Sequence, residues 1–194
     1  MSRLIAFNKP YGVVCQFSAD GKHPTLKDFI AIPSVYPAGR LDTDSEGLLL
    51  LTDDGGLQAR IADPRHKLDK EYWVQVEGIA DLGALRKLEA GLDLGDFIAG
   101  PAAAEAIAET PGLWERVPPV RFRKTVPTSW ISLVISEGKN RQVRRMTAAV
   151  GLPTLRLVRA RIGPWRLENL PPGTWREVAI PTSPAPTAGQ RKKS

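Results

Sequence analysis

Short apolar runs with the two-residue period of β-strands dominate the chain, and few segments have the period of a helix. Residues 48–51 are four consecutive leucines, which indicate a buried strand, and KEYWVQVEG (70–78) alternates apolar and polar side chains. The pattern predicts further strands at 130–136, 154–163 and 174–180, and two short strands around a turn within 3–17. It predicts helices at 25–30, 57–63, 81–91 and 139–151, whereas AAAEAIAE (102–109) fits a helix or a strand.

Many strands with few, irregularly spaced helices indicate an α+β fold with a mixed, largely antiparallel sheet. The chain has 194 residues, enough for one domain with a sizeable core or for two small lobes that share a cleft. We expect one folded domain over residues 1–181, built as two lobes with a central cleft. The low-complexity, basic residues 182–194 should form a disordered tail.

Composition and charge narrow the class of protein. No apolar run approaches the roughly 20 residues that span a bilayer, and the single cysteine excludes an internal disulfide, so we expect a cytoplasmic monomer without a membrane partner. The sequence has no phosphate-binding glycine loop and no zinc pattern, so no cofactor or metal is expected. Residues 1–113 carry 11 Lys and Arg against 17 Asp and Glu, but residues 114–177 carry 13 against 4. Such a basic half predicts nucleic-acid binding.

The segment GRLDTDSEGLLLLT (39–52) places Asp42, Asp44 and Glu46 directly before the four leucines. A carboxylate against an apolar wall loses hydration and needs a partner or a chemical role. Calcium fits poorly, because Asp53 is too short for the last position of a calcium loop and Pro37 and Gly39 interrupt the helix that should precede it. A solvated loop that neutralises a nearby arginine is the simpler alternative.

The same segment resembles the signature of the ribosomal small-subunit and large-subunit pseudouridine synthases of the B/E/F type, G-R-L-D-x-x-[ST]-x-G-L followed by three aliphatic residues and Thr. Three further segments are similar in the same order: FNKPYGVV, KEYWVQVEG, and EGKNRQVRRM with RLVRARIG. The region of resemblance starts at Arg3 and includes no S4 RNA-binding domain. In this respect the sequence is most similar to the E-type enzymes of the large subunit.

The resemblance implies an RNA pseudouridine synthase, an isomerase that needs no cofactor and acts on a flipped-out uridine of 23S ribosomal RNA. It implies that Asp42 is the catalytic carboxylate and that Tyr72 packs on the uracil. Asp44 and Glu46 fall on variable positions of the signature, for which solvated or RNA-repelling roles are expected. The alternatives that remain are the same chemistry on small-subunit or transfer RNA, and a non-catalytic RNA-binding assembly factor.

The basic helix expected at 139–151 should supply the cation that keeps Asp42 ionised. Val143, Met146 and Val150 share one face at helical spacing, and Arg144 lies roughly 100° from Val143, at the border of that face. Arg144 also matches the arginine of the family's R-Q-V-R motif, so we predict an Asp42–Arg144 pair. The expected phosphate contacts of the RNA are Arg40, Lys9, Lys139, Arg141 and Arg145, of which Arg141 and Arg145 should face outward.

Overall fold

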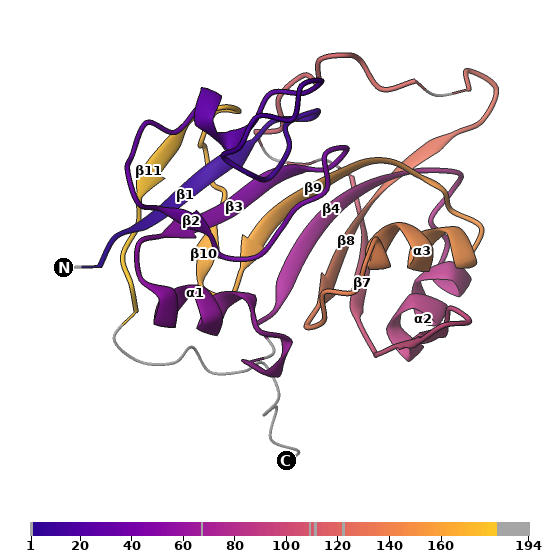
Figure 1. The fold of residues 1–194 in the computed structure, drawn as a ribbon. Helices are drawn as coiled ribbons and strands as arrows, with labels where there is room; N and C mark the ends of the chain where they lie inside the picture. Colours follow the sequence, from indigo (N-terminus) through magenta and orange to yellow (C-terminus); the bar gives the residue numbers. More distant parts are fainter. Residues whose placement is uncertain (1, 67, 109, 111, 122, 182–194) are drawn as a thin grey trace.

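The computed structural model describes residues 2–181 except 67, 109, 111 and 122, so the predicted tail lies outside the described residues. Within this part of the chain, nine strands form one sheet with a mostly antiparallel path, and a separate pair of short strands lies beside it. The path through the large sheet is β11-β1-β3-β9-β4-β8-β7, with β2 attached to β3 and β10 to β9 (Figure 1). The α+β class with a mixed sheet is therefore confirmed.

Most predicted segments contain an element of the predicted type, but the short elements β2, β5, β6, β10 and η2 were not predicted. The strands are β1 (Leu4–Lys9), β2 (Tyr36–Pro37), β3 (Glu46–Thr52), β4 (Lys70–Glu77), β5 (Leu92–Asp93), β6 (Ile98–Ala99), β7 (Ala103–Ile107), β8 (Thr128–Ile135), β9 (Thr154–Ile162), β10 (Trp165–Arg166) and β11 (Trp175–Glu177). The α-helices are α1 (Gly55–Ala62), α2 (Leu82–Ala90) and α3 (Gln142–Ala149), and the short 3-10 helices are η1 (Leu26–Asp28) and η2 (Pro64–His66).

Two of the predicted segments differ from the structure. The second strand expected within residues 3–17 is absent there, because Val14 makes only an isolated bridge to Thr25 and the segment around it is a loop. The ambiguous segment at 102–109 contains the edge strand β7, which pairs with β8. Its small alanines fit a strand whose other neighbour is helix α2.

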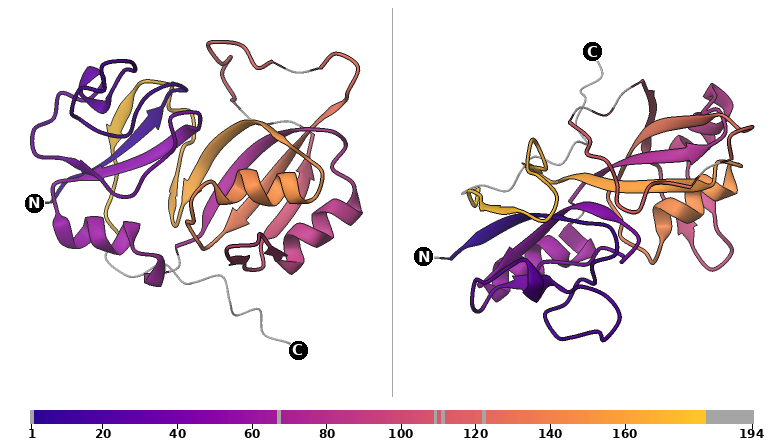
Figure 2. Two further views of the ribbon diagram at one scale, coloured as in Figure 1. Left: turned by 45° about the vertical axis from the view of Figure 1, so that its right-hand side comes forward. Right: turned by 90° about the horizontal axis from the view of Figure 1, so that it is seen from above.

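The sheet is divided into two lobes at the contact between β3 and β9 (Figure 2). These two strands are parallel and pair through only two positions, Glu46 with Val158 and Gly47 with Arg159. The backbones approach so closely that a Cβ atom on Gly47 would lie 2.4 Å from the carbonyl oxygen of Arg159, and its φ of 102° also favours glycine. Gly47 is thus required where the lobes meet, directly after the acidic segment.

The four leucines are buried because β3 is covered on both faces. Leu48 and Leu50 pack with residues of α1, whereas Leu49 and Leu51 pack with the segment that contains η1. All four have no exposed surface, as the alternating directions of strand side chains require when both faces are covered. The packing of β3 in the N-terminal lobe therefore fixes the start of this strand, and with it the position of the loop that precedes it.

The C-terminal lobe has its own core between the β9-β4-β8-β7 sheet and the helices α2 and α3. Val143 and Met146 of α3 point into this core, as the helical spacing predicted. Among the described residues, no helix is long and apolar enough to cross a membrane.

Candidate active site

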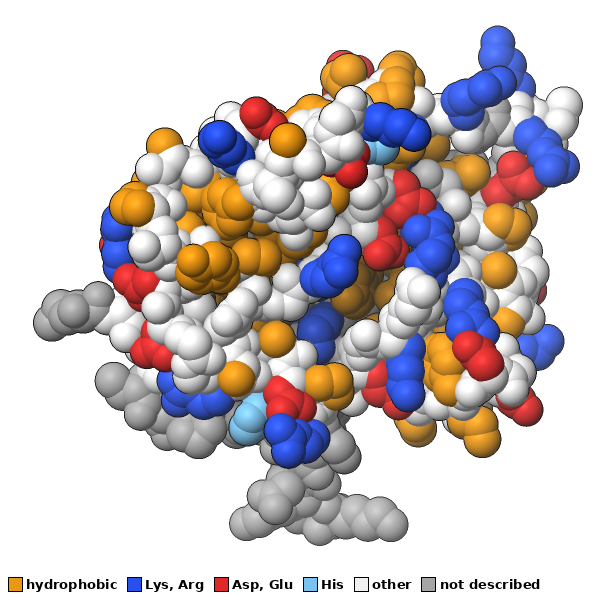
Figure 3. Space-filling model, in the orientation of Figure 1, with side chains coloured by type: hydrophobic (Ala, Val, Ile, Leu, Met, Phe, Trp, Pro, Cys, Tyr) orange, Lys and Arg blue, Asp and Glu red, His pale blue; other side chains and the backbone are white. Residues whose placement is uncertain are grey.

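A cleft of about 850 Å³ lies between the lobes and contains most of the predicted site residues. It is lined by the loop before β3, by β4 and β9, and by the residues that precede α3. The space-filling view shows the molecule hollowed at this point, with basic and acidic side chains around the hollow (Figure 3). Asp42, Tyr72, Arg40, Lys139 and Arg141 all line the cleft.

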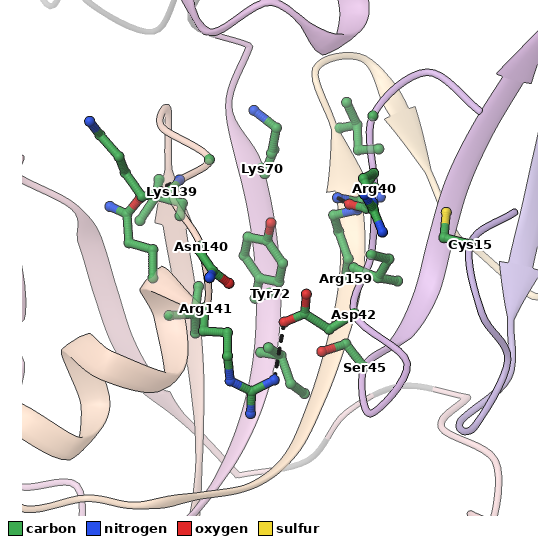
Figure 4. A pocket seen from close by; sticks show the side chains of 18 of the residues that line it. Cys15, Arg40, Asp42, Ser45, Lys70, Tyr72, Lys139, Asn140, Arg141 and Arg159 are labelled. Atoms are coloured by element: carbon green, nitrogen blue, oxygen red, sulfur yellow. Dashed lines mark hydrogen bonds and ion pairs between the residues drawn. The ribbon is translucent and has the colours of Figure 1, made fainter. Parts of the chain in front are cut away.

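Asp42 lies on a turn that two backbone contacts hold in place. The N–H of Ser45 donates to the carbonyl oxygen of Asp42 at 3.0 Å, and the N–H of Gly12 donates to that of Thr43 at 2.8 Å. The Asp42 side chain remains 42% exposed and lies next to Tyr72 in the cleft (Figure 4). The Asp42 carboxylate is thus accessible to solvent, although it lies only a few residues before the buried strand β3.

The cation that contacts Asp42 is Arg141, and the predicted pair of Asp42 with Arg144 is wrong. Arg141 Nη1 lies 3.4 Å from Asp42 Oδ2, and its guanidinium donates to both carboxylate oxygens of Asp44 at 3.1 and 2.9 Å. The helical wheel does not apply to Arg141, because this residue precedes α3 in a left-handed conformation with φ of 49°. Its side chain therefore turns back toward the acidic loop instead of facing outward.

Arg144 contacts the backbone of the same acidic loop. Its Nη2 donates to the backbone carbonyl oxygen of Asp44 at 2.7 Å and to Ser45 Oγ at 3.4 Å, and its side chain is 14% exposed. Burial raises the pKa of Asp44, but the hydrogen bond from Arg141 and the charges of Arg144 and Arg141 outweigh it, so this pKa lies below its usual range. The loop is thus held by two arginines with different contacts.

Glu46 was expected to be solvated, but the structure shows it fully buried. Both of its carboxylate oxygens accept hydrogen bonds from Arg156, at 2.8 and 2.9 Å, and Trp114 Nε1 donates to it at 2.9 Å. The position lies on β3 itself, one residue before Gly47, so its side chain points into the junction of the lobes. The variable position of the signature is here a structural ion pair.

Lys9 is also buried, and the prediction of a phosphate contact there is wrong. Its ammonium donates to the carbonyl oxygens of Pro10 and Val13, both at 2.9 Å, and has no exposed surface. Burial lowers its pKa to about 8, against the partly compensating charges of Cys15 and Glu46. Lys9 fixes the turn that follows β1.

The other predicted phosphate contacts fall into two kinds. Arg40 and Lys139 are exposed at the rim of the cleft, where a phosphate could reach them. Arg145 already has partners, because it pairs with Asp96, donates to the carbonyl oxygen of Leu94 at 2.7 Å and lies 4.8 Å from the ring centre of Phe97. Arg145 faces outward as predicted, with 34% of its side chain exposed, but these partners already occupy its guanidinium.

Tyr72 lies on β4 with its ring in the floor of the cleft, 8% exposed. The two-residue alternation along β4 places Lys70 on the same side as Tyr72. Burial, followed by the charge of Arg159, lowers the pKa of Lys70. The floor and one side of the cleft are therefore aromatic and positively charged.

Arg159 is a cleft residue that the sequence did not single out. It lies opposite Tyr72 on β9, is 4% exposed, and donates from Nε to the carbonyl oxygen of Leu48 at 2.8 Å and from Nη1 to that of Arg40 at 3.2 Å. Nothing in the sequence distinguishes it from Arg156 and Arg161 on the same strand. Within the described ranges, no cluster of three or more His, Cys, Asp or Glu side chains could hold a metal ion.

Residues 3–149 match the family model described as RNA pseudouridylate synthase. The chain belongs to this family. It is 58% identical, over 89% of its length and 94% of the relative, to a ribosomal large subunit pseudouridine synthase E of Xanthomonas campestris pv. campestris. It is 52% identical to the protein of the same name from Vibrio vulnificus, over 93% of the chain and 76% of the relative.

The fold agrees with this assignment. A crystal structure of a pseudouridylate synthase superimposes with a TM-score of 0.76 at 31% identity, covering 92% of this chain and 71% of that one. The family resemblance read from the four motifs is confirmed, and the chain is an RNA pseudouridine synthase. The first residues of the signature motif, before β3, form the loop that presents Asp42 to the cleft.

Proposed function

We propose that this synthase converts a uridine of large-subunit ribosomal RNA to pseudouridine, with Asp42 as the catalytic carboxylate and without a cofactor. The observation that carries the proposal is the position of Asp42, a half-exposed carboxylate beside Tyr72 in a cleft between two lobes. The choice of large-subunit RNA is supported by the names of relatives at 58% and 52% identity.

The reaction requires a carboxylate near the ribose and a platform for the base. The bond between uracil N1 and ribose C1′ breaks, the base turns, and a bond forms between C5 and C1′, while C5 loses a proton and N1 gains one. No electrons are gained or lost in this isomerisation, so a redox cofactor has no role in it. As in glycoside hydrolysis, positive charge develops on the sugar as the bond loosens, and a carboxylate such as Asp42 stabilises it or reacts with the ribose.

The dimensions of the cleft suit one nucleotide taken out of its stack. Its volume of about 850 Å³ falls within the range of roughly 300–1,000 Å³ of small-ligand pockets. A uridine in a stacked or paired strand cannot reach Asp42, so the target base must turn out of the RNA and pack on Tyr72. Arg40 and Lys139 on the rim would hold the phosphates on either side.

The test is release of tritium from large-subunit RNA that carries 5-tritiated uridine, in the presence of a chelator. The purified chain should release about one equivalent per RNA molecule, and Asp42→Asn should release none. Release that requires a divalent ion even on prefolded RNA would contradict the cofactor-free mechanism. Release only from small-subunit or transfer RNA would contradict the target, and no release from any RNA would favour the assembly factor.

The modified position can be found in cells. Pseudouridines are mapped in ribosomal RNA from a strain that lacks this gene and from its parent. One large-subunit pseudouridine should disappear in the deletion strain and return when the wild-type gene is restored, but not with Asp42→Asn.

A further inference from the structure

Strand β9 carries three arginines, Arg156, Arg159 and Arg161, whose surroundings differ because the strand is irregular. In its pairing with β4, Arg159 lies opposite Tyr72 and Arg161 lies opposite Glu71, so Ala160 has no partner. In a regular strand, residues 159 and 161 would share one face. The extra residue is a β-bulge, which places Arg159 on the face of Tyr72 and Arg161 on the other face.

Two of these arginines have a carboxylate partner and one does not. Arg156 pairs with Glu46 at 2.8 Å, and Arg161 pairs with Glu71 at 3.1 Å. Among the described residues, no carboxylate forms a salt bridge with Arg159, and its Nη2 is buried without a hydrogen-bond partner. A buried charge without a counterion is costly, so its retention in a cleft points to a partner supplied by the substrate.

The charges around Arg159 increase this cost. Its positive charge helps to lower the pKa of Lys70, after burial, and also acts on buried Lys9, the pKa of which is lowered to about 8 mainly by burial. These cations lie close together, and Figure 4 shows Asp42 on the same side of the Tyr72 ring as Arg159. An anionic group bound here would relieve the repulsion among these cations.

We propose that Arg159 binds the target base, donating from its guanidinium to a carbonyl oxygen of the uracil that packs on Tyr72. This inference rests on the proposed function. When the N1–C1′ bond breaks, both electrons leave with the base, and the negative charge spreads to its carbonyl oxygens. The electron-poor ribose then faces Asp42 and the electron-rich base faces Arg159, so each developing charge meets a fixed charge of opposite sign.

A base carbonyl fits this position better than a phosphate. Directly opposed residues of an antiparallel pair have neighbouring side chains, so a ring stacked on Tyr72 brings its edge to Arg159. The bonds to the carbonyl oxygens of Leu48 and Arg40 hold the guanidinium in the cleft floor, 4% exposed. The exposed cations Arg40 and Lys139 at the rim are the ones that strongly hydrated phosphates can reach.

The first test compares Arg159→Lys with Arg161→Lys, which remove one guanidinium each from the two faces of the same strand and keep its charge. Single-turnover rates are measured with saturating enzyme on the RNA whose target uridine has been mapped, together with RNA affinity. Arg159→Lys should slow the reaction about 100-fold, with affinity changed less than threefold, as for loss of one donor to a developing oxyanion. Arg161→Lys should stay within twofold of wild type. Equal rates for the two variants would overturn the proposal.

The second test changes the substrate atom and does not depend on how well a variant folds. RNA is synthesised with 2-thiouridine or 4-thiouridine at the target, because sulfur accepts a hydrogen bond more weakly than oxygen. One of the two should slow wild-type enzyme, and the same substitution should add little to the effect of Arg159→Lys. Full additivity for both, or no effect of either on wild type, would refute a contact with the base.

The remaining outcomes separate this inference from the proposed function. If Arg159 holds a phosphate instead, Arg159→Lys should lower affinity and alter the salt dependence of binding, with the thio effects additive, and the inference fails while the function stands. If wild-type enzyme does not convert the unmodified RNA, the proposed function itself fails. The unmodified RNA with wild-type enzyme is therefore included in every series.

Discussion

Two groups of ion pairs have acids within residues 42–46 but differ in their surroundings. At the cleft, Asp42 and Asp44 share Arg141, and the three side chains are 42%, 36% and 46% exposed. At the junction of the lobes, Glu46 pairs with Arg156, and these two are 1% and 6% exposed. The two groups have the same chemistry but differ in access to water.

Access to water determines what each group can do. The buried pair cannot exchange partners, because a lone charge in the interior costs several kcal/mol, so it serves to join β3 to β9. The exposed group loses little when Arg141 moves, because water screens the charges that are left. A substrate could therefore displace the contacts of Arg141 with Asp42 and Asp44, while the buried pair of Glu46 with Arg156 keeps the loop in place.

The largest expected effect is that of Asp42→Asn, which tests the exposed group. The amide keeps the shape of the carboxylate but removes its charge and its ability to act on the ribose. Turnover should fall by at least about 10⁴-fold, which corresponds to about 5.5 kcal/mol in the barrier, with folding and RNA affinity nearly unchanged. Single-turnover tritium release measures the rate, circular dichroism measures folding, and a binding titration measures RNA affinity. If Asp44→Asn loses as much activity, the assignment of catalysis to Asp42 alone is wrong.

Glu46→Gln tests the buried pair and should affect stability instead of chemistry. It leaves Arg156 buried without a counterion, so the free energy of unfolding should fall by about 3–5 kcal/mol, measured by urea denaturation. The double variant Glu46→Gln with Arg156→Met should recover much of this loss, because no unpaired charge remains. A single variant as stable as wild type would show that the junction does not depend on this pair.

Arg141→Ala and Arg144→Ala should separate the contacts that the two arginines make with the acidic loop. Arg144→Ala removes a buried donor from the carbonyl oxygen of Asp44, so stability should fall by about 1–3 kcal/mol and the rate should fall with it. Arg141→Ala removes a half-exposed partner of Asp42, so the rate should fall roughly tenfold while the melting temperature changes little. The reverse pattern, a stability loss only for Arg141→Ala, would contradict the contacts described here.

The sequence predicted the longer elements and the candidate catalytic segment because these depend on local patterns. The four leucines, the alternation of KEYWVQVEG and the spacing of Val143 and Met146 each reflect a single strand or helix face. The signature motif identified Asp42 in the same way, as a position within one continuous segment. Its presence in the cleft agrees with that prediction.

The errors concern side chains whose direction depends on irregular backbone or distant residues. Arg141 lies before its helix with positive φ, so no helical wheel could place it. Arg159 reaches the cleft through a bulge, and Glu46 is buried by a partner 110 positions later. Lys9 looked like a surface cation, although its ammonium satisfies two carbonyl oxygens inside the turn. Tight turns, irregular backbone and contacts between distant segments all lack the periodic pattern that marks a helix or strand face.

The smallest expected effect concerns the pH dependence of the exposed group. The pKa of Asp44 is lowered in the folded protein, so its ionised form stabilises the fold above the usual aspartate pKa of about 4, and this contribution is lost as the pH falls below that value. Because the carboxylate is 36% exposed, the contribution should be at most about 1 kcal/mol. Wild type and Asp44→Asn should thus differ slightly in stability at pH 7, and the difference should vanish toward pH 2 and shrink in 1 M salt. Urea denaturation of both proteins between pH 2 and 7 measures it. A difference that persists at pH 2 would mean that Asp44 acts through packing and not through its charge.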